Sequence, residues 1–200
     1  MRISHSKLEE VRQDPKKYKK SLEGESGFQG RPGRYRYWQF ATRKYHYEGI
    51  ESAEKHLVKL FRNFAVNSKS DRLLEDHISY LHQYVNDFIE LGNEVIKVGD
   101  KINLEINYNN FLGGEVQRLD FSIDGGYEVY LMIKEDYIWE SELRFPLIQH
   151  YYAKELGCGY EDISVGVYCF SRGEHVIEKY TEEEIKKALK EVDYISNIIK

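Results

Sequence analysis

The stretch Gly114–Leu156, GEVQRLDFSIDGGYEVYLMIKEDYIWESELRFPLIQHYYAKEL, is the part of this 200-residue chain that decides the expected fold. An alternating segment, QRLDFSI, is followed by two glycines and by a second alternating segment, YEVYLMIKE. Alternation with a period of two, interrupted by glycine, is typical of a β-hairpin. The residues from about 140 to 156 then take up helical spacing. The stretch therefore predicts a strand, a turn, a strand and a helix, in that order.

The flanking sequence predicts helices before this hairpin and further strands after it. Helical patterns cover about 6–14, 15–22, 37–64 and 71–91, with a glycine-rich loop at 23–37. Ser6 and Glu9 have capping-box spacing, as do Thr181 and Glu184 before a last helix. Alternation predicts three more strands, at about 102–108, 163–170 and 175–180.

These patterns predict a single α/β (α+β) domain with a mixed central sheet flanked by helices. We expect a helical part at 1–93, a sheet core with one helix at 94–180, and a C-terminal helix at 181–200. No apolar run approaches the ~20 residues of a membrane span, so no membrane partner is expected. Cys158 and Cys169 form no CxxC pair, which argues against a zinc site and favours a cytoplasmic (intracellular) protein.

The net charge of −5 is unevenly distributed along the chain. Residues 1–47 contain 12 Lys/Arg and 5 Asp/Glu, giving +7, whereas the remainder has 17 basic and 29 acidic residues, giving −12. An overall basic surface would favour nonspecific binding to nucleic acid. This distribution supports at most a local basic patch.

The second strand of the hairpin has two different faces. Val129, Leu131 and Ile133 form an apolar face that should pack under a helix, because residues i and i+2 of a strand share one side. The opposite face is chemically mixed and ends on a lysine: Glu128, Tyr130, Met132 and Lys134.

This order of elements resembles the PD-(D/E)XK nuclease superfamily, especially its RecB-type branch and the related CRISPR-adaptation nucleases. Gln117-Arg118-Leu119-Asp120 is similar to the family's Gly-Arg-Ile-Asp, although the glycine is missing. Lys134 matches the lysine of the acid-x-Lys motif, but the acid falls on Met132. Gln149 and Tyr152 resemble the Gln-x-x-x-Tyr helix with a spacing of three instead of four.

The resemblance implies a restriction-endonuclease-like core and a site for Mg²⁺ or Mn²⁺. Asp120 would bind the metal, Lys134 would orient the attacking water, and Gln149 with Tyr152 would contact the nucleic-acid strand. A thioether at Met132 is a poor ligand for a hard cation. The missing acid would have to come from another carboxylate, for which the candidates are Glu135, Glu140 and Glu142. Glu105, on the preceding strand, is a weaker candidate for an additional acid.

A basic, aromatic segment offers a second candidate contact with DNA. In Gly30–Phe40 the arginines Arg34 and Arg36 alternate with rings that include Trp38. Arginine pairs with phosphate, and aromatic rings stack on unpaired bases. The alternative is a segment whose rings fold into the core while its arginines face water.

Two classes of function follow from these residues. The first is a Mg²⁺- or Mn²⁺-dependent deoxyribonuclease with a relocated acid. The second is a catalytically inactive pseudonuclease that binds nucleic acid or a protein partner. A third and weaker alternative is a structural or inhibitory protein of phage origin whose resemblance to nucleases is accidental.

Overall fold

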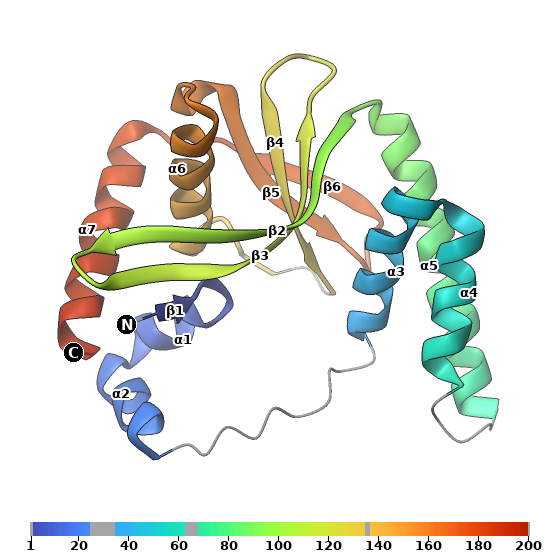
Figure 1. Ribbon diagram of the computed structural model, residues 1–200, viewed down its shortest axis with the longest axis horizontal. Helices are drawn as coiled ribbons and strands as arrows, with labels where there is room; N and C mark the ends of the chain where they lie inside the picture. Colours follow the sequence, from blue (N-terminus) through green and yellow to red (C-terminus); the bar gives the residue numbers. More distant parts are fainter. Residues whose placement is uncertain (1, 25–34, 63–67, 135–136, 200) are drawn as a thin grey trace.

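The computed structural model describes residues 2–24, 35–62, 68–134 and 137–199. Over these residues the chain forms a mixed sheet flanked by helices, as expected from the sequence (Figure 1). The strands are β1 (Arg2–Ser4), β2 (Glu94–Asn107), β3 (Asn110–Phe121), β4 (Tyr127–Ile133), β5 (Ile163–Cys169) and β6 (Glu174–Glu178). The helices are α1 (Leu8–Gln13), α2 (Pro15–Gly24), α3 (Tyr35–Glu48), α4 (Ile50–Phe61), α5 (Ser68–Leu91), α6 (Arg144–Leu156) and α7 (Glu182–Ile199).

The strand order is β1-β3-β4-β5-β6, with β2 on the other edge of β3. Strands β2, β3 and β4 are antiparallel, and the β3–β4 turn contains Gly125 and Gly126 at φ values of 92° and 81°, which favour glycine. Helix α6 connects β4 to β5, which runs parallel to β4, and β6 pairs antiparallel to β5. The predicted strand–turn–strand–helix order is therefore confirmed.

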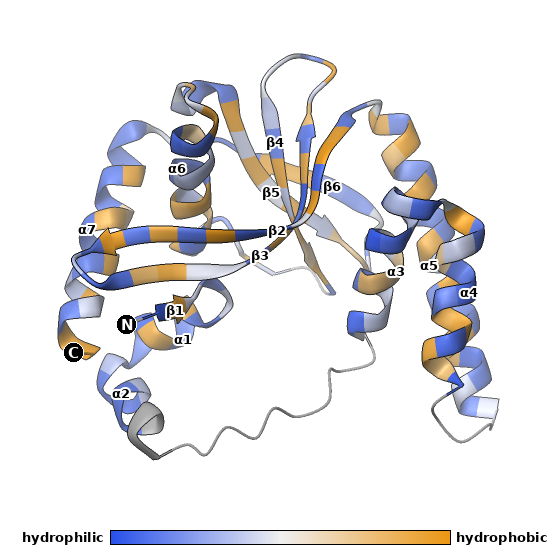
Figure 2. Cartoon of the chain, in the orientation of Figure 1, coloured by the Kyte–Doolittle hydropathy of each residue, from blue (hydrophilic) through white to orange (hydrophobic). Residues whose placement is uncertain are grey.

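Two helical layers cover the sheet, with α6 and α7 on one side and α3, α4 and α5 on the other (Figure 1). The predicted faces of β4 are confirmed. Val129, Leu131 and Ile133 join the core under α6, whereas Met132 joins the aromatic core under α3 and α5. Figure 2 shows apolar and polar residues mixed along α4 and α5, as expected of amphipathic helices with one buried stripe.

Some local predictions are corrected by the structure. The helical pattern at 37–64 is two helices, because Gly49 adopts a left-handed φ of 81° between α3 and α4. The Thr181–Glu184 capping box is formed, but Ser6 caps no helix, and Glu9 instead accepts a hydrogen bond from the backbone of Leu143. Within the described ranges, no helix combines the length and the apolar character that crossing a membrane requires.

Candidate functional site

A gap in the central sheet creates the main candidate site. One edge of β3 pairs with β2 along almost its whole length. Its other edge pairs with β1 at Phe111–Gly113 and with β4 at Arg118–Phe121. A strand has only two hydrogen-bonding edges, so β1 and β4 must share this second one. Residues 114–117 lie between these two pairings, and on this second edge the described chain supplies no strand to pair with them.

Side chains replace the missing ladder at this gap. The Gln117 side-chain oxygen accepts a hydrogen bond from the Met132 backbone N–H at 3.0 Å, and the Gln39 amide donates to the Met132 carbonyl at 3.1 Å. On the other side, His5 Nε2 lies 3.1 Å from the Glu115 carbonyl oxygen. Unpaired backbone groups are costly to bury, so these three side chains stabilise an opening that the ladder cannot close.

An open cavity of about 670 Å³ occupies this gap, within the size range of small-ligand sites. The charged residues of its described lining are Arg36, Lys134, Arg144 and Glu115. Glu115 is partly neutralised, because its carboxylate lies 3.5 Å from the guanidinium of Arg43. The remaining lining is polar or apolar: Ser4, His5, Ser6, Gln39, Phe40, Gly114, Gln117, Leu131, Met132, Ile133 and Tyr137.

His5 is the buried imidazole of this cavity. A carbonyl can only accept, so Nε2 carries the hydrogen that bonds Glu115. Burial is the main cause that lowers the His5 pKa to about 4, which makes the ring neutral at pH 7. Gly114 makes room for it, because a Cβ there would lie 2.0 Å from His5 Cδ2. The ring therefore shapes the cavity without adding charge.

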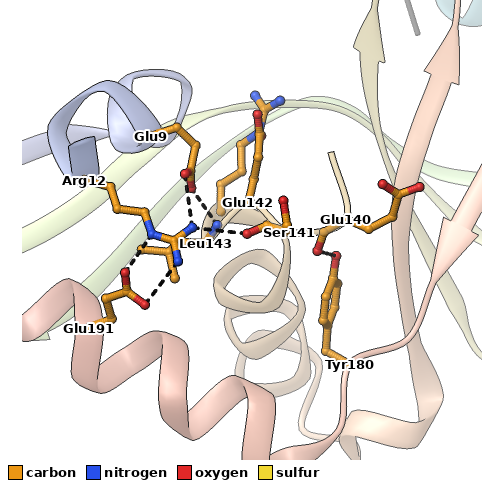
Figure 3. Close-up of polar contacts among 9 residues, drawn as sticks. Glu9, Arg12, Glu140, Ser141, Glu142, Leu143, Tyr180 and Glu191 are labelled. Carbon is orange, nitrogen blue, oxygen red and sulfur yellow. Dashed lines mark hydrogen bonds and ion pairs between the residues drawn. The ribbon is translucent and has the colours of Figure 1, made fainter. Parts of the chain in front are cut away.

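Polar contacts join α1, α7 and the segment before α6 (Figure 3). Arg12 donates to Glu191 at 2.6 Å and to the Ser141 carbonyl at 3.2 Å. Glu9 accepts the Leu143 backbone N–H at 2.7 Å. This bracing holds residues 141–143 in place immediately before Arg144, which lines the cavity.

The proposed relocated acids that the structure describes, Glu105, Glu140 and Glu142, do not gather into one cluster. Glu142 forms an ion pair with Arg144 at 2.5 Å, and burial raises the Glu142 pKa. The Glu140 carboxylate points away from that of Glu142, and the Glu140 carbonyl accepts a bond from the Tyr180 hydroxyl at 2.8 Å (Figure 3). Glu135 lies outside the described residues. Glu105 is exposed on β2 opposite Phe111, whereas Asp120 lies opposite Val95.

Asp120 and Lys134 are not part of one site. Asp120 pairs with Glu128 across the hairpin, and Glu128 precedes Lys134 by six residues, which is roughly 20 Å along a strand. Asp120 is fully buried and accepts a hydrogen bond from Arg118 Nε at 2.8 Å. The expectation of a shared Asp120–Lys134 centre is corrected by this register, which the sequence order did not reveal.

Asp120 belongs instead to a buried network centred on Arg118. The Arg118 guanidinium donates to the Tyr84 hydroxyl at 2.6 Å and lies 3.0 Å from His175 Nε2. It also lies over the ring of Tyr130 at 4.6 Å. Burial, opposed by Arg118, raises the Asp120 pKa to about 6. The Asp120–Arg118 pair therefore ties the sheet to α5 through Tyr84.

Gln149 and Tyr152 are also used by the fold. The Gln149 amide donates to the carbonyls of Tyr160 and Tyr180 at 3.0 Å, and its oxygen accepts the Tyr180 backbone N–H at 2.8 Å. The Tyr152 hydroxyl donates to Asp100 at 3.0 Å. Both side chains have no exposed surface, so neither can make the expected contact with a nucleic-acid strand.

The basic, aromatic segment is divided between surface and core. Arg36 is exposed and lines the cavity. Trp38 is 2% exposed and packs against Tyr168 and Phe170, so it cannot stack on a base. Arg34 lies outside the described residues. An exposed Arg36 and a buried Trp38 match the alternative in which the rings fold into the core while the arginines face water.

The described residues do not fit a Mg²⁺ or Mn²⁺ centre. Hard cations need several oxygen ligands, and no cluster of three or more Asp, Glu, His or Cys occurs in the ranges the structure describes. At the acid-x-Lys position the Met132 sulfur accepts a hydrogen bond from Thr42 at 3.4 Å inside the aromatic core. The charged side chains in the described lining of the cavity are instead three basic residues and one acidic residue.

Sequence reasoning missed His5, Gln39 and Gln117 as residues of the cavity. His5 directly follows β1. A strand of three residues is too short to show a period in the sequence. Gln39 stands one residue after Trp38 in the segment already singled out, and Gln117 stands three before Asp120. Their roles depend on the sheet gap, for which the linear sequence carries no signal.

Comparison with known proteins gives one partial similarity. No protein-family model matches the chain. It is 29% identical over 120 residues to a phosphoribosylaminoimidazole-succinocarboxamide synthase of Pyrococcus abyssi (strain GE5 / Orsay). The match covers 58% of this chain and 48% of that protein, so the chain spans about half of the relative's length.

Proposed function

We propose that this chain is a nuclease-like binding module that holds nucleic acid by its phosphates at the sheet-gap cavity and does not cut it by metal-dependent hydrolysis. The proposal combines the fold expected from the nuclease resemblance with a site whose carboxylates are dispersed. DNA is the proposed partner. The two free cysteines, Cys158 and Cys169, are compatible with the intracellular location that we propose with it.

The observation that carries the proposal is the charge of the cavity lining. Arg36 and Lys134 are exposed and line the cavity, and Arg144 is a third basic lining residue, whose charge is partly neutralised by Glu142 at 2.5 Å. Among the described lining residues the acidic one is Glu115, which Arg43 partly neutralises. Such a surface attracts phosphate oxygens, and it is local, as the charge distribution along the chain predicts.

The test is binding of a labelled oligodeoxynucleotide, measured by fluorescence anisotropy over a range of salt concentrations. Lys134→Gln and Arg36→Gln should each weaken binding and reduce the slope of log K against log [salt] by about 0.7 for a single strand. Lys187→Gln on α7, an exposed charge removed from the cavity, is the matched control. Equal slopes for all three variants would remove the cavity from the proposal.

The same samples test the absence of cutting. Incubation with linear single- and double-stranded DNA in Mg²⁺ and in Mn²⁺ should leave the DNA intact. Metal-dependent cleavage that is lost in Lys134→Ala would instead support the nuclease hypothesis, and Glu135 would then be the first acid to substitute.

A second candidate is supported by the similarity to the Pyrococcus abyssi synthase and by the cavity volume. The name of that enzyme denotes a phosphoribosyl compound, and a phosphate group of such a molecule would suit the same arginines and lysine. Ribose 5-phosphate distinguishes the candidates. It should compete poorly with an oligonucleotide if the cavity serves a polymer, and strongly if the cavity serves a small phosphorylated metabolite.

A further inference from the structure

Helix α3 has a surface stripe in which arginines alternate with aromatic rings: Arg36, Phe40, Arg43 and Tyr47. The spacing i, i+4, i+7 and i+11 keeps all four on one face of the helix. All four are exposed, Phe40 at 41% and Tyr47 at 62% of their surface. At 1.5 Å per residue the stripe is roughly 16 Å long, with a cation or a ring about every 5 Å.

The stripe is continuous with the sheet-gap cavity. Arg36 and Phe40 line that cavity. Phe40 also lines a second hollow of about 280 Å³ farther along α3, together with Arg43 and Tyr47. A polymer held by its phosphate at Lys134 therefore has a path from the cavity onto the surface of α3.

The far half of the stripe is held in place by the sheet. The Tyr47 hydroxyl donates to the Val98 carbonyl at 3.0 Å, which fixes the ring while most of it stays exposed. The Arg43 guanidinium packs on Gly99, where a Cβ would lie 2.6 Å away, and it reaches Glu115 at 3.5 Å. Exposed rings that are already ordered lose little conformational entropy when they bind.

We propose that the Arg36–Phe40–Arg43–Tyr47 stripe is a track for single-stranded nucleic acid, in which the arginines contact phosphates and the two rings stack on unpaired bases. This inference rests on the proposed function and adds the strand type and the path of the ligand. Alternation of cations and rings suits a chain that alternates phosphates and bases. A duplex keeps its bases stacked inside, so the rings of the stripe would have no base faces to contact.

The test compares oligothymidylates of about 4 and about 16 nucleotides, the range that single-strand-binding domains occupy. Tyr47→Leu should weaken binding of the longer oligonucleotide about 10-fold, because one stacking contact is lost. It should leave the shorter one unchanged, since that one fills the cavity alone. Tyr194→Leu on α7, where the ring is 68% exposed, is the matched control and should change neither.

The salt dependence separates rings from charges. Arg43→Gln should lower the slope of log K against log [salt] by about 0.7 for the longer oligonucleotide, whereas Tyr47→Leu should not change the slope. Tyr47→Phe keeps the ring and should bind the longer oligonucleotide more tightly than Tyr47→Leu does.

Three outcomes would overturn the track. They are wild-type affinity of Tyr47→Leu for the longer oligonucleotide, equal affinity for a duplex of the same length, and displacement by polyglutamate as effective as by unlabelled oligothymidylate. Failure of the proposed function looks different, because the shorter oligonucleotide would then fail to bind or would bind Lys134→Gln as well as wild type.

Discussion

Gln117 and Met132 are joined where their strands separate: the Gln117 side-chain oxygen accepts the Met132 backbone N–H at 3.0 Å. Up to Arg118 and Tyr130 the two strands pair normally. Beyond that point a side chain substitutes for the ladder, and the space it spans becomes the cavity. Met132 stands at the position of the acid in the acid-x-Lys motif. Its backbone is held by hydrogen bonds to side chains, while its own side chain packs into the core.

We expect Gln117→Leu to destabilise the protein. The substitution removes the acceptor for a partly buried N–H, which should lower the free energy of unfolding by about 1–3 kcal/mol. Gln117→Glu keeps an oxygen at the same position and should cost less. Urea unfolding monitored by circular dichroism measures both, and identical midpoints for the two variants would contradict this role.

Asp120 should matter for stability and not for binding. Asp120→Asn removes the buried counter-charge of Arg118, and breaking such a pair costs about 3–5 kcal/mol. Lys134→Gln removes a charge from an exposed side chain instead of a buried one. We expect it to change the free energy of unfolding by no more than about 0.5 kcal/mol. At a temperature where both are folded, oligonucleotide binding should be normal in Asp120→Asn and weakened in Lys134→Gln. The reverse pattern would return Asp120 to the functional site.

Restoring the acid of the acid-x-Lys motif should not create a nuclease. Met132→Glu places a carboxylate in a position that is 8% exposed, while Asp120 still lies roughly 20 Å from Lys134 along the strand. We expect lower stability and no DNA cleavage in Mg²⁺ or Mn²⁺. Met132→Leu, which conserves volume, should cost less than about 1.5 kcal/mol. Metal-dependent cutting by Met132→Glu would show that the site needs only this residue.

Stability should fall on acidification because buried histidines are held neutral. Burial lowers the pKa of His5 to about 4, and burial followed by repulsion from Arg118 lowers those of His46 and His175 to about 3. Between pH 6.5 and 4 the unfolded chain binds protons at these histidines and the folded chain does not. The free energy of unfolding therefore falls by up to about 1.4 kcal/mol per histidine for each pH unit of acidification. The raised pKa of Asp120 acts in the opposite direction between about pH 4 and 6.

The measurement is the unfolding free energy from urea titrations at several pH values. It should decrease from pH 7 to pH 5, and His175→Gln should make the decrease shallower. A stability that rises on acidification would mean that Asp120 outweighs the three histidines.

The local sequence pattern was sufficient to predict the hairpin and the faces of β4, but not which parts of the chain pack against them. The alternation of Val129, Leu131 and Ile133 correctly predicted the face of β4 that meets α6, because side-chain direction in a strand depends only on local geometry. Gly125 and Gly126 marked the hairpin turn for the same reason. Trp38 shows the limit, since nothing in its neighbouring residues distinguishes a ring in the aromatic core from one on the surface.

The sequence by itself determined the strand–turn–strand–helix order of residues 114–156, the two faces of β4, and the uneven charge. The tertiary structure alone decided that Asp120 faces Arg118, that β1 and β4 share one edge of β3, and that a basic cavity opens between them. The reason is physical. Periodicity is a property of consecutive residues, whereas register and edge pairing depend on contacts between residues such as His5 and Glu115, which lie 110 positions apart.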